Sequence, residues 1–544
     1  MVSTIFKRGT RAFLSEQHTI LSAAAVIGSI YVLSAFLGFI RNRMLSGYFG
    51  DSAELGIFFA ADVIPNLILS LVVSGALSSA FIPVFNKVYK DDPDKAWGIT
   101  SIVLNTSLLI FLIFTLVVFF SADFISREII AKNSSLTVSD LAMMASLMRV
   151  MMFAQVIFIL SNFFTSILQS FKRFVVPSLA PVMYNLGIII FIVLFVGKYG
   201  IFAPAYGMIF GALLHMAIQL PLVKNLGFKY SRIVDIRNKG VREIYALFVP
   251  RAIGQAAQKI LVPLYTNLAL FISAPSNVIL TFATDIQNVP VRVFGISLGQ
   301  AALPLLSLAY NKDNTTDFKK LLMKTLHQVI FFVMPISILI FILRVPLVRL
   351  AVGARKYPWE ATVMTAYSLG FFSISIVAQA LVLILARAFY AACDTKTPLK
   401  ISLVSMMVSA SFAVFFVKYL HLGVWSISLS YTIGSFVNCL LLFIAVVKRL
   451  GGIDLRAFLE PVNRIGFATL ITGLALYIPL KVLDGLIFDT TRTFGLFVLT
   501  GTVTLIGFVT YSFLAKILKI KEYELLVSSL METSLVRRFV RKAI

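Results

Sequence analysis

Hydrophobic and polar positions alternate along this chain in long blocks. Apolar runs recur between residues 18 and 516, and short stretches rich in Lys, Arg, Gly and Pro separate them. A run of about twenty apolar residues is long enough for an α-helix to cross the hydrocarbon core of a bilayer. About fourteen segments meet this length criterion, so we predict an all-α polytopic membrane protein with about fourteen transmembrane helices.

The order of the spans predicts two six-helix lobes followed by two extra helices. We expect an interfacial N-terminal segment at 1–17, an N-lobe at 18–222, a basic cytoplasmic linker at 223–242, a C-lobe at 243–447, and two further helices with a basic tail at 448–544. The predicted spans are 18–40, 57–85, 98–121, 141–171, 175–197, 200–222, 243–273, 277–310, 324–350, 360–392, 398–418, 422–447, 462–483 and 493–516.

Weak internal echoes support the division into two pseudo-symmetric lobes. Spans six and twelve open with glycine, apolar and small residues, and glycine again at the same interval. Spans four and ten end in a polar turn before a proline, and spans two and eight each carry an aspartate followed by two prolines. Internal repeats of this kind are typical of transporters. The paired stretches are GIFAPAYGMIFG (200–211) with GVWSISLSYTIG (423–434), QSFKRFVVP with FYAACDTKTP, and the segments beginning at Asp62 and Asp285.

Composition agrees with a membrane protein and narrows its chemistry. The chain is 59% hydrophobic and only 13% charged, too apolar for a soluble fold of this length. A net charge of +24 would suggest nucleic acid in a soluble protein. Here the basic residues lie mostly in short loops, so we predict cytoplasmic termini and no nucleic-acid partner. Two cysteines and four unpaired histidines predict neither a disulfide framework nor a metal site.

Several ionisable residues fall within predicted spans, where a charge is costly and usually faces protein or water. They give a net positive interior that suits an anionic ligand such as a phosphate or diphosphate, which arginine recognises through bidentate hydrogen bonds. The candidate ligand-binding residues are Arg41, Arg43, Arg149, Arg251, Lys259 and Arg292. Asp62 and Asp285 are candidates for ion coupling or for charge pairing. Asp285 and Arg292 are seven residues apart, so we expect them on one helical face.

Simpler roles stand beside these hypotheses. Arg387 at the end of span ten is interpreted as a snorkelling anchor. Arg149 fits an anchor as well as a ligand, and the two aspartates fit helix-to-helix pairing. We find no Gly-rich phosphate loop, nucleophile elbow or histidine cluster, so the sequence predicts a transporter that is not an enzyme and has no cofactor.

Seven short motifs resemble the MurJ/MviN lipid II flippase family, within the multidrug/oligosaccharidyl-lipid/polysaccharide exporter superfamily. In chain order they are LGFIRNRMLSGYFG (37–50), IPNL with SGALSSAFIPVF (64–85), LQSFKRFVVPSLAPVMYN (168–185), QLP (219–221), GISLGQAALPLLS (295–307), FYAACDTKTPLKIS (389–402) and SISLS with Asn438. The resemblance implies fourteen helices, a central cavity, and alternating access driven by membrane potential, H⁺ or Na⁺. It implies hinge or gating roles at Pro65, Gly75, Pro83, Pro290, Gly295, Gly299 and Pro304.

Several positions depart from the family pattern. An arginine usual before LGF is Ala35, and the acid usual after Arg41 is Asn42. An arginine pair after PNL is replaced by Leu69 and Ser70, a glutamate by Ser74, and an Asp-Arg pair by Thr284-Asp285. We hypothesise that the other arginines supply the missing charge. Arg41 keeps a family position and is expected to face the ligand. Arg43 is either an interfacial anchor or a stand-in for the charge lost at position 35.

The resemblance implies that a lipid-linked peptidoglycan precursor (lipid II) crosses the bacterial cytoplasmic membrane during cell-wall biogenesis, which also sets cell shape. Membrane lipids, and cell-wall synthesis proteins as recruited partners, are expected with it. The departures leave two alternatives: a flippase for another polyprenyl-diphosphate-linked oligosaccharide, and a transport-inactive scaffold. A drug or cation antiporter is disfavoured because a cation site would need net acidity.

Overall fold

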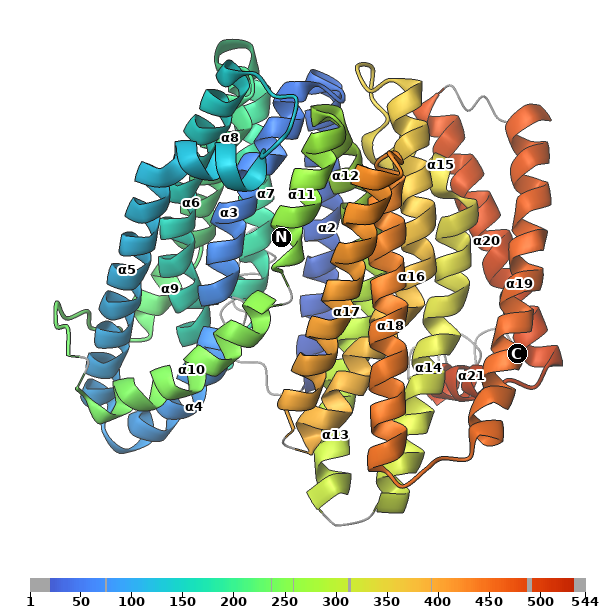
Figure 1. Cartoon of the computed structure of the whole chain (residues 1–544). Coiled ribbons are helices and arrows are strands. Elements are labelled where there is room, and N and C mark those ends of the chain that lie inside the picture. The colour runs from blue at the N-terminus through green and yellow to red at the C-terminus, as the bar shows by residue number, and fades with distance from the viewer. Residues whose placement is uncertain are drawn as a thin grey trace, which may run out of the picture. The chain divides into compact units, whose positions relative to one another are not determined.

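A computed structural model describes residues 20–532 apart from 74–75, 236, 258, 312–314, 393 and 487–491. Throughout these ranges the chain forms helices joined by turns and loops (Figure 1). The first group is α2 (Ile20–Phe49), α3 (Ala53–Val73), α4 (Ala76–Asp91), α5 (Pro93–Phe124), the π-helix η1 (Ile125–Ile130), α6 (Val138–Ser170), α7 (Val175–Tyr199), α8 (Phe202–Ala217), α9 (Leu220–Asn225), α10 (Lys239–Ala257) and α11 (Leu261–Ile272).

The second group begins with α12 (Ala274–Pro290) and the π-helix η2 (Val291–Ile296). It continues through α13 (Ser297–Asn311), α14 (Thr315–Ile342), α15 (Arg344–Val352), α16 (Trp359–Ala391), α17 (Lys396–Val414), η3 (Phe415–Tyr419), α18 (Trp425–Arg449), α19 (Leu455–Leu486), α20 (Thr493–Ile517) and α21 (Lys521–Glu532). The all-helical prediction is confirmed, since each predicted span coincides with one or more of these helices.

Eleven helices in the described ranges are long and apolar enough to cross a membrane. On α5 most side chains from Leu109 to Val117 are apolar and exposed, and they form a nearly continuous surface. Such a surface is unfavourable in water but favourable in contact with lipid. The chain is therefore a multi-pass membrane protein. A total of fourteen spans stays a prediction.

Several predicted spans are divided into shorter helices, and prolines lie near the division in two of them. Span 243–273 becomes α10 and α11, and Pro263 lies in the first turn of α11, where a missing N–H is tolerated. Span 277–310 becomes α12 and α13 with η2 between them, and α12 ends at Pro290. Pro290 has no backbone N–H, so it cannot donate the usual α-helical hydrogen bond, and the hydrogen-bond pattern changes from α to π after it.

The helices form two compact units. One extends from α2 to Val278 and includes Ala354–Pro358, and the other holds the remaining residues from Ile279 onward. Within the first unit α6 packs against α3, α5 and α8, and α8 packs against α7 (Figure 1). Within the second unit α16 packs against α13, α14 and α18, and α18 packs against α17. The same neighbours recur at matching positions of the two halves, which supports the internal repeat.

Glycines at the ends of the two repeated motifs make matching contacts. A methyl group added at Gly211 would lie 2.5 Å from the carbonyl oxygen of Tyr184 on α7. One added at Gly434 would lie 2.6 Å from Cβ of Ser409 on α17. Each glycine thus lets the last helix of its half approach the preceding helix closely. The division of the chain into lobes at residue 222 stays a prediction. Along the chain, the boundary between the two compact units falls between Val278 and Ile279.

The last two predicted spans are α19 and α20, which pack against each other and against α14. Tyr511 of α20 donates a hydrogen bond to the carbonyl oxygen of Phe331 at 2.9 Å. The short helix α21 follows, and its Tyr523 and Leu526 pack against a buried apolar cluster that contains Phe331, Tyr511 and Ile520. These helices are an addition to the repeated halves, as the sequence predicted.

Candidate functional site

Arg41 lies on α2 with its guanidinium held by two side-chain amides. Its Nε and Nη2 donate to Oδ1 of Asn42 at 3.2 and 3.0 Å, and its Nη1 donates to Oδ1 of Asn185 on α7 at 3.2 Å. Within the described ranges Arg41 forms no ion pair with a carboxylate. Neutral acceptors therefore fix the orientation of the side chain while leaving its charge available to an anion.

Asn185 was not among the residues predicted for the site. It is buried, with 8% of its surface exposed, and its Nδ2 donates to the carbonyl oxygens of Ser34 at 3.3 Å and Pro181 at 3.2 Å. The amide thus joins α2 to α7 while it accepts from Arg41. The available signal was one amide inside an otherwise apolar helix, in the stretch PVMYN.

Asp62 lies on α3 in a partly buried position beside these residues. Its Oδ2 accepts a hydrogen bond from Asn66, one helical turn later, and its Oδ1 is buried without a hydrogen-bond partner. The positive charges of Arg41 and Lys259 are both close enough to act on this carboxylate electrostatically. The structure therefore brings Arg41, Asp62 and Lys259 together within the first unit. We call these three residues the N-unit charge cluster.

Lys259 completes the cluster from the turn between α10 and α11, where its side chain is exposed. Tyr184 of α7 lies near enough to both Asp62 and Arg41 for their charges to act on its hydroxyl. Two cations and one acid with an unsatisfied oxygen leave a net positive charge. Such a group can hold an anionic headgroup, and Asp62 can hold a proton or a small cation.

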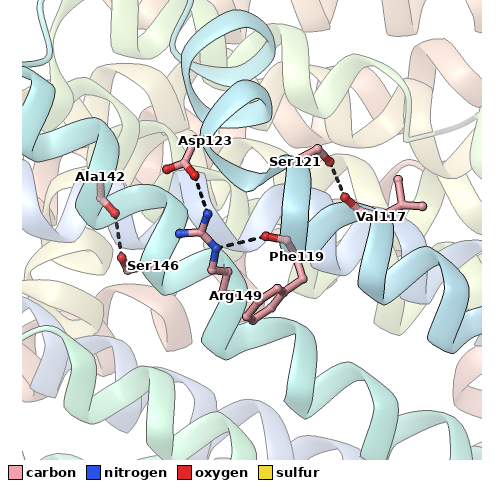
Figure 2. A network of polar contacts seen from close by, with 7 residues as sticks. All are labelled: Val117, Phe119, Ser121, Asp123, Ala142, Ser146 and Arg149. Atoms are coloured by element: carbon pink, nitrogen blue, oxygen red, sulfur yellow. Dashed lines mark hydrogen bonds and ion pairs between the residues drawn. The ribbon is translucent and has the colours of Figure 1, made fainter.

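Arg149 on α6 is engaged elsewhere in the first unit. Figure 2 shows its guanidinium between the carboxylate of Asp123 and the main-chain carbonyl of Phe119. Nε donates to that carbonyl at 3.0 Å, and the guanidinium lies 5.7 Å from the centroid of the Phe119 ring. These contacts tie α6 to the end of α5, and they favour the anchor interpretation over ligand binding.

The predicted pair in the second unit lies in two different types of helix. Asp285 is half-buried on α12, whereas Arg292 is exposed and lies in η2. The expectation assumed continuous α-helix, and the π-helix that follows Pro290 changes the residue spacing per turn. The shared face of Asp285 and Arg292 therefore stays a prediction.

Two of the predicted hinge glycines are packing positions against α16. Gly295 in η2 faces Ala380 and Leu383, and Gly299 on α13 lies against the guanidinium of Arg387. Arg387 is partly buried, and η2 and α13 both pack on α16. Any side chain added at Gly299 would displace this arginine, so Gly299 sets the distance between the two helices.

The remaining predicted residues are distributed as follows. Arg43 is half-buried on α2, Pro65 is buried inside α3, and Pro83 is exposed on α4. Their functional roles stay predictions. Gly75 and the side chains of Arg251 and Pro304 lie outside the described residues. No three His, Cys, Asp or Glu side chains gather as a metal site in the part of the chain that the structure describes.

Comparison with known proteins decides the family. The sequence profile described as "Lipid II flippase MurJ" matches residues 45–493. The chain belongs to this lipid II flippase family. The family match covers Asp62 and Lys259 but begins after Arg41. A binding role of Arg41 is therefore supported by its contacts with Asn42 and Asn185. The family resemblance that the motifs carry is confirmed.

Relatives of the MurJ family extend over most of the chain. "Lipid II flippase MurJ" of Burkholderia cenocepacia is 28% identical over 437 residues, 78% of this chain and 84% of that protein. "Probable lipid II flippase MurJ" of Buchnera aphidicola subsp. Baizongia pistaciae is 27% identical over 430 residues, 78% of this chain and 83% of that protein.

Two solved structures have a fold similar to that of this chain. "Lipid II flippase MurJ, inward closed conformation" superimposes with a TM-score of 0.74 at 22% identity, covering 91% of this chain and 98% of that one. An inward-facing multidrug resistance transporter of the MATE family, in the MOP superfamily, gives a TM-score of 0.64 at 16% identity over 79% of this chain and 98% of that one. The fold of this chain is therefore similar to the folds of these two transporters.

Proposed function

We propose that this chain is a flippase that moves lipid II from the inner to the outer leaflet of the bacterial cytoplasmic membrane for cell-wall synthesis. The observation that carries the proposal is the MurJ family match over residues 45–493. The N-unit charge cluster adds a chemical reason, because Arg41 and Lys259 offer two cations to a diphosphate. The termini are proposed to be cytoplasmic.

Arg41 contributes a guanidinium that neutral amides orient. Two oxygens of a diphosphate can each accept one of two parallel hydrogen bonds from such a planar group. Lys259 supplies a point charge on a flexible stem in the adjacent turn, where it can follow the ligand. Binding would be strongest in the state that presents both cations to the headgroup, and movement of the surrounding helices would then carry the headgroup across.

Asp62 is proposed to couple this cycle to an ion or to the membrane potential. Its carboxylate has one unsatisfied oxygen beside two cations. An incoming diphosphate would compete with Asp62 for those cations, and a proton or Na⁺ on Asp62 would remove the repulsion between the two anions. Asp285 begins the similar Asp–Pro–Pro stretch of the second half and is proposed as the second coupling candidate.

Complementation tests the function. The chain is expressed in bacteria depleted of their own lipid II flippase, and growth and the pool of lipid-linked precursor are measured. We expect restored growth and a normal precursor pool. An unrelieved accumulation of precursor, with the chain present in the membrane at the wild-type level, would contradict the proposal. Asp62→Asn, assayed in parallel, is expected to reduce the dependence of transport on membrane potential.

A further inference from the structure

The segment between α9 and α10 is fixed along α5 over several residues. The main-chain N–H of Ser231 donates to Oγ of Ser101 at 3.1 Å. Nδ2 of Asn105 donates to the carbonyl oxygens of Ser231 and Ile233, both at 2.9 Å. Two side chains of α5 therefore hold the main chain of this stretch in place. We call residues 229–234 the pinned segment.

Side chains of residues 228–230 add three further contacts to α5. Oδ1 of Asn105 accepts from the hydroxyl of Tyr230 at 2.9 Å, so its amide bonds the segment through both ends. Nζ of Lys229 pairs with Asp94 at 2.7 Å. The ring of Phe228 meets Trp97 edge-on at a centroid distance of 5.5 Å. A linker that only joins two lobes would not need this set of specific contacts.

The burial pattern of α5 gives the depth of the pinned segment. Side chains between Ala96 and Ser107 are almost all buried, whereas Leu109, Ile110, Leu112 and Ile113 are exposed. These exposed apolar residues are the part of the helix that faces lipid. Asn105 precedes Leu109 by about one helical turn, or about 6 Å. The pinned segment therefore lies at the level where hydrocarbon gives way to lipid headgroups.

The outer side of the segment combines apolar and cationic groups. Tyr230, Ile233 and Val234 are 54%, 52% and 54% exposed. Arg232 between them is exposed, as are the basic residues that follow it, Arg237, Lys239 and Arg242. Lys229 is neutralised by Asp94, and Asp235 is the single acid between residues 224 and 242. Apolar side chains interleaved with cations are typical of surfaces that rest in the membrane interface.

We propose that residues 230–235 and 237–242, held on α5 by Asn105 and Ser101, form a binding site for the headgroups of anionic phospholipids. Tyr230, Ile233 and Val234 would enter the acyl boundary, and Arg232 and Arg237 would bind lipid phosphates. The bound lipids are structural lipids of the leaflet, so the site is separate from the one for the transported substrate.

Lipid selectivity tests the proposal. The full chain is placed in nanodiscs that contain spin-labelled phosphatidylglycerol or phosphatidylcholine, and the motionally restricted fraction of each lipid is measured. We expect a preference for phosphatidylglycerol that weakens with salt. In Arg232→Gln/Arg237→Gln the preference should fall by about five-fold per arginine at low salt, as expected for cations at an anionic surface.

Two further variants separate a built site from general charge. Lys516→Gln/Lys519→Gln removes two exposed cations near the end of α20 and should leave the preference unchanged. Asn105→Ala keeps every cation but releases the main chain, and should weaken the preference. An unchanged preference in either the arginine variant or Asn105→Ala, or an equal loss in the lysine control, would overturn the proposal. None of these outcomes depends on transport activity.

Discussion

At the scale of single residues, the contacts of Arg41 distinguish it from the other arginines. Its partners Asn42 and Asn185 are neutral, whereas Arg149 is paired with Asp123. An arginine in a direct ion pair has much of its charge cancelled, whereas Arg41 donates to amides and interacts with Asp62 without an ion pair. The two side chains are therefore expected to respond differently to substitution.

Arg41→Ala is expected to abolish transport while the protein still folds. The substitution removes a charge-assisted contact to the diphosphate, which costs about 2 kcal/mol or more, or roughly thirty-fold in affinity. The complementation assay and the apparent melting temperature measure the two effects. Arg41→Lys keeps the charge without the planar fork and should be intermediate. Wild-type transport by Arg41→Ala would contradict a role in ligand binding and would favour membrane anchoring for this residue.

Arg149→Gln is expected to retain transport and to lose a little stability. The ion pair with Asp123 is partly exposed, and such pairs contribute about 1 kcal/mol or less. Asp123→Asn removes the same pair from the other side, so both variants should show a similar small decrease in melting temperature. Loss of transport with unchanged stability in Arg149→Gln alone would instead place this residue at the ligand.

Charged site residues could be predicted from the sequence, and their neutral partners could not. Arg41, Asp62 and Lys259 are conspicuous because a charge in an apolar span is costly and needs a reason. Asn185 carries no such cost, so its contact with Arg41 becomes visible only when α2 and α7 are seen together. Arg149 was ambiguous for a similar reason, since its partner Asp123 belongs to the preceding helix.

At the scale of elements, changes in helix geometry matter most. The apolar pattern located every described span, but it did not show that the span at 277–310 changes to a π-helix after Pro290. A hydrophobic run indicates the length and burial of a helix, but it carries little information about the hydrogen-bond pattern inside that helix. The different helix types of Asp285 and Arg292 could therefore not be predicted from the sequence.

The start of α17 provides an element-scale prediction with a pH dependence. Asp394 accepts hydrogen bonds from the N–H groups of Lys396 and Thr397 at 3.1 and 3.0 Å, and from Arg449 at 2.7 Å. The backbone N–H of Thr397 is the largest cause that lowers the pKa of Asp394, and the charge of Arg449 adds to it. A carboxylate at a helix N-terminus is also favoured by the helix dipole.

Asp394→Ala is expected to lower stability by about 1 kcal/mol at neutral pH. Because the folded-state pKa is lowered, this stabilisation is present above the usual aspartate pKa and is lost as pH falls through the folded-state value. The difference in melting temperature between wild type and variant should therefore shrink below about pH 4. Asp394→Asn keeps the acceptor without the charge and should lie between them. A difference that persists unchanged in acid would contradict this account.

At the scale of the whole molecule, the internal repeat links the sequence to a transport mechanism. The fourth and tenth spans, α6 and α16, have corresponding neighbours in the two halves, and Gly211 and Gly434 make corresponding close contacts. The glycine motifs were weak individually, but the packing places Gly211 and Gly434 at corresponding positions of the two halves. The apolar pattern and the motifs predicted the fold class and the family. The contacts that complete the charge cluster required the structure.

The appearance of lipid II in the outer leaflet tests most directly whether this chain is a lipid II flippase. Lipid II is incorporated on one side of proteoliposomes that contain the purified chain, and a membrane-impermeant enzyme that cleaves the headgroup is added to the other side. We predict that cleavage proceeds with the wild-type chain and is lost with Arg41→Ala at equal protein content. Cleavage no faster than in protein-free liposomes, under an imposed membrane potential and ion gradient, would contradict the assignment of this chain as a lipid II flippase.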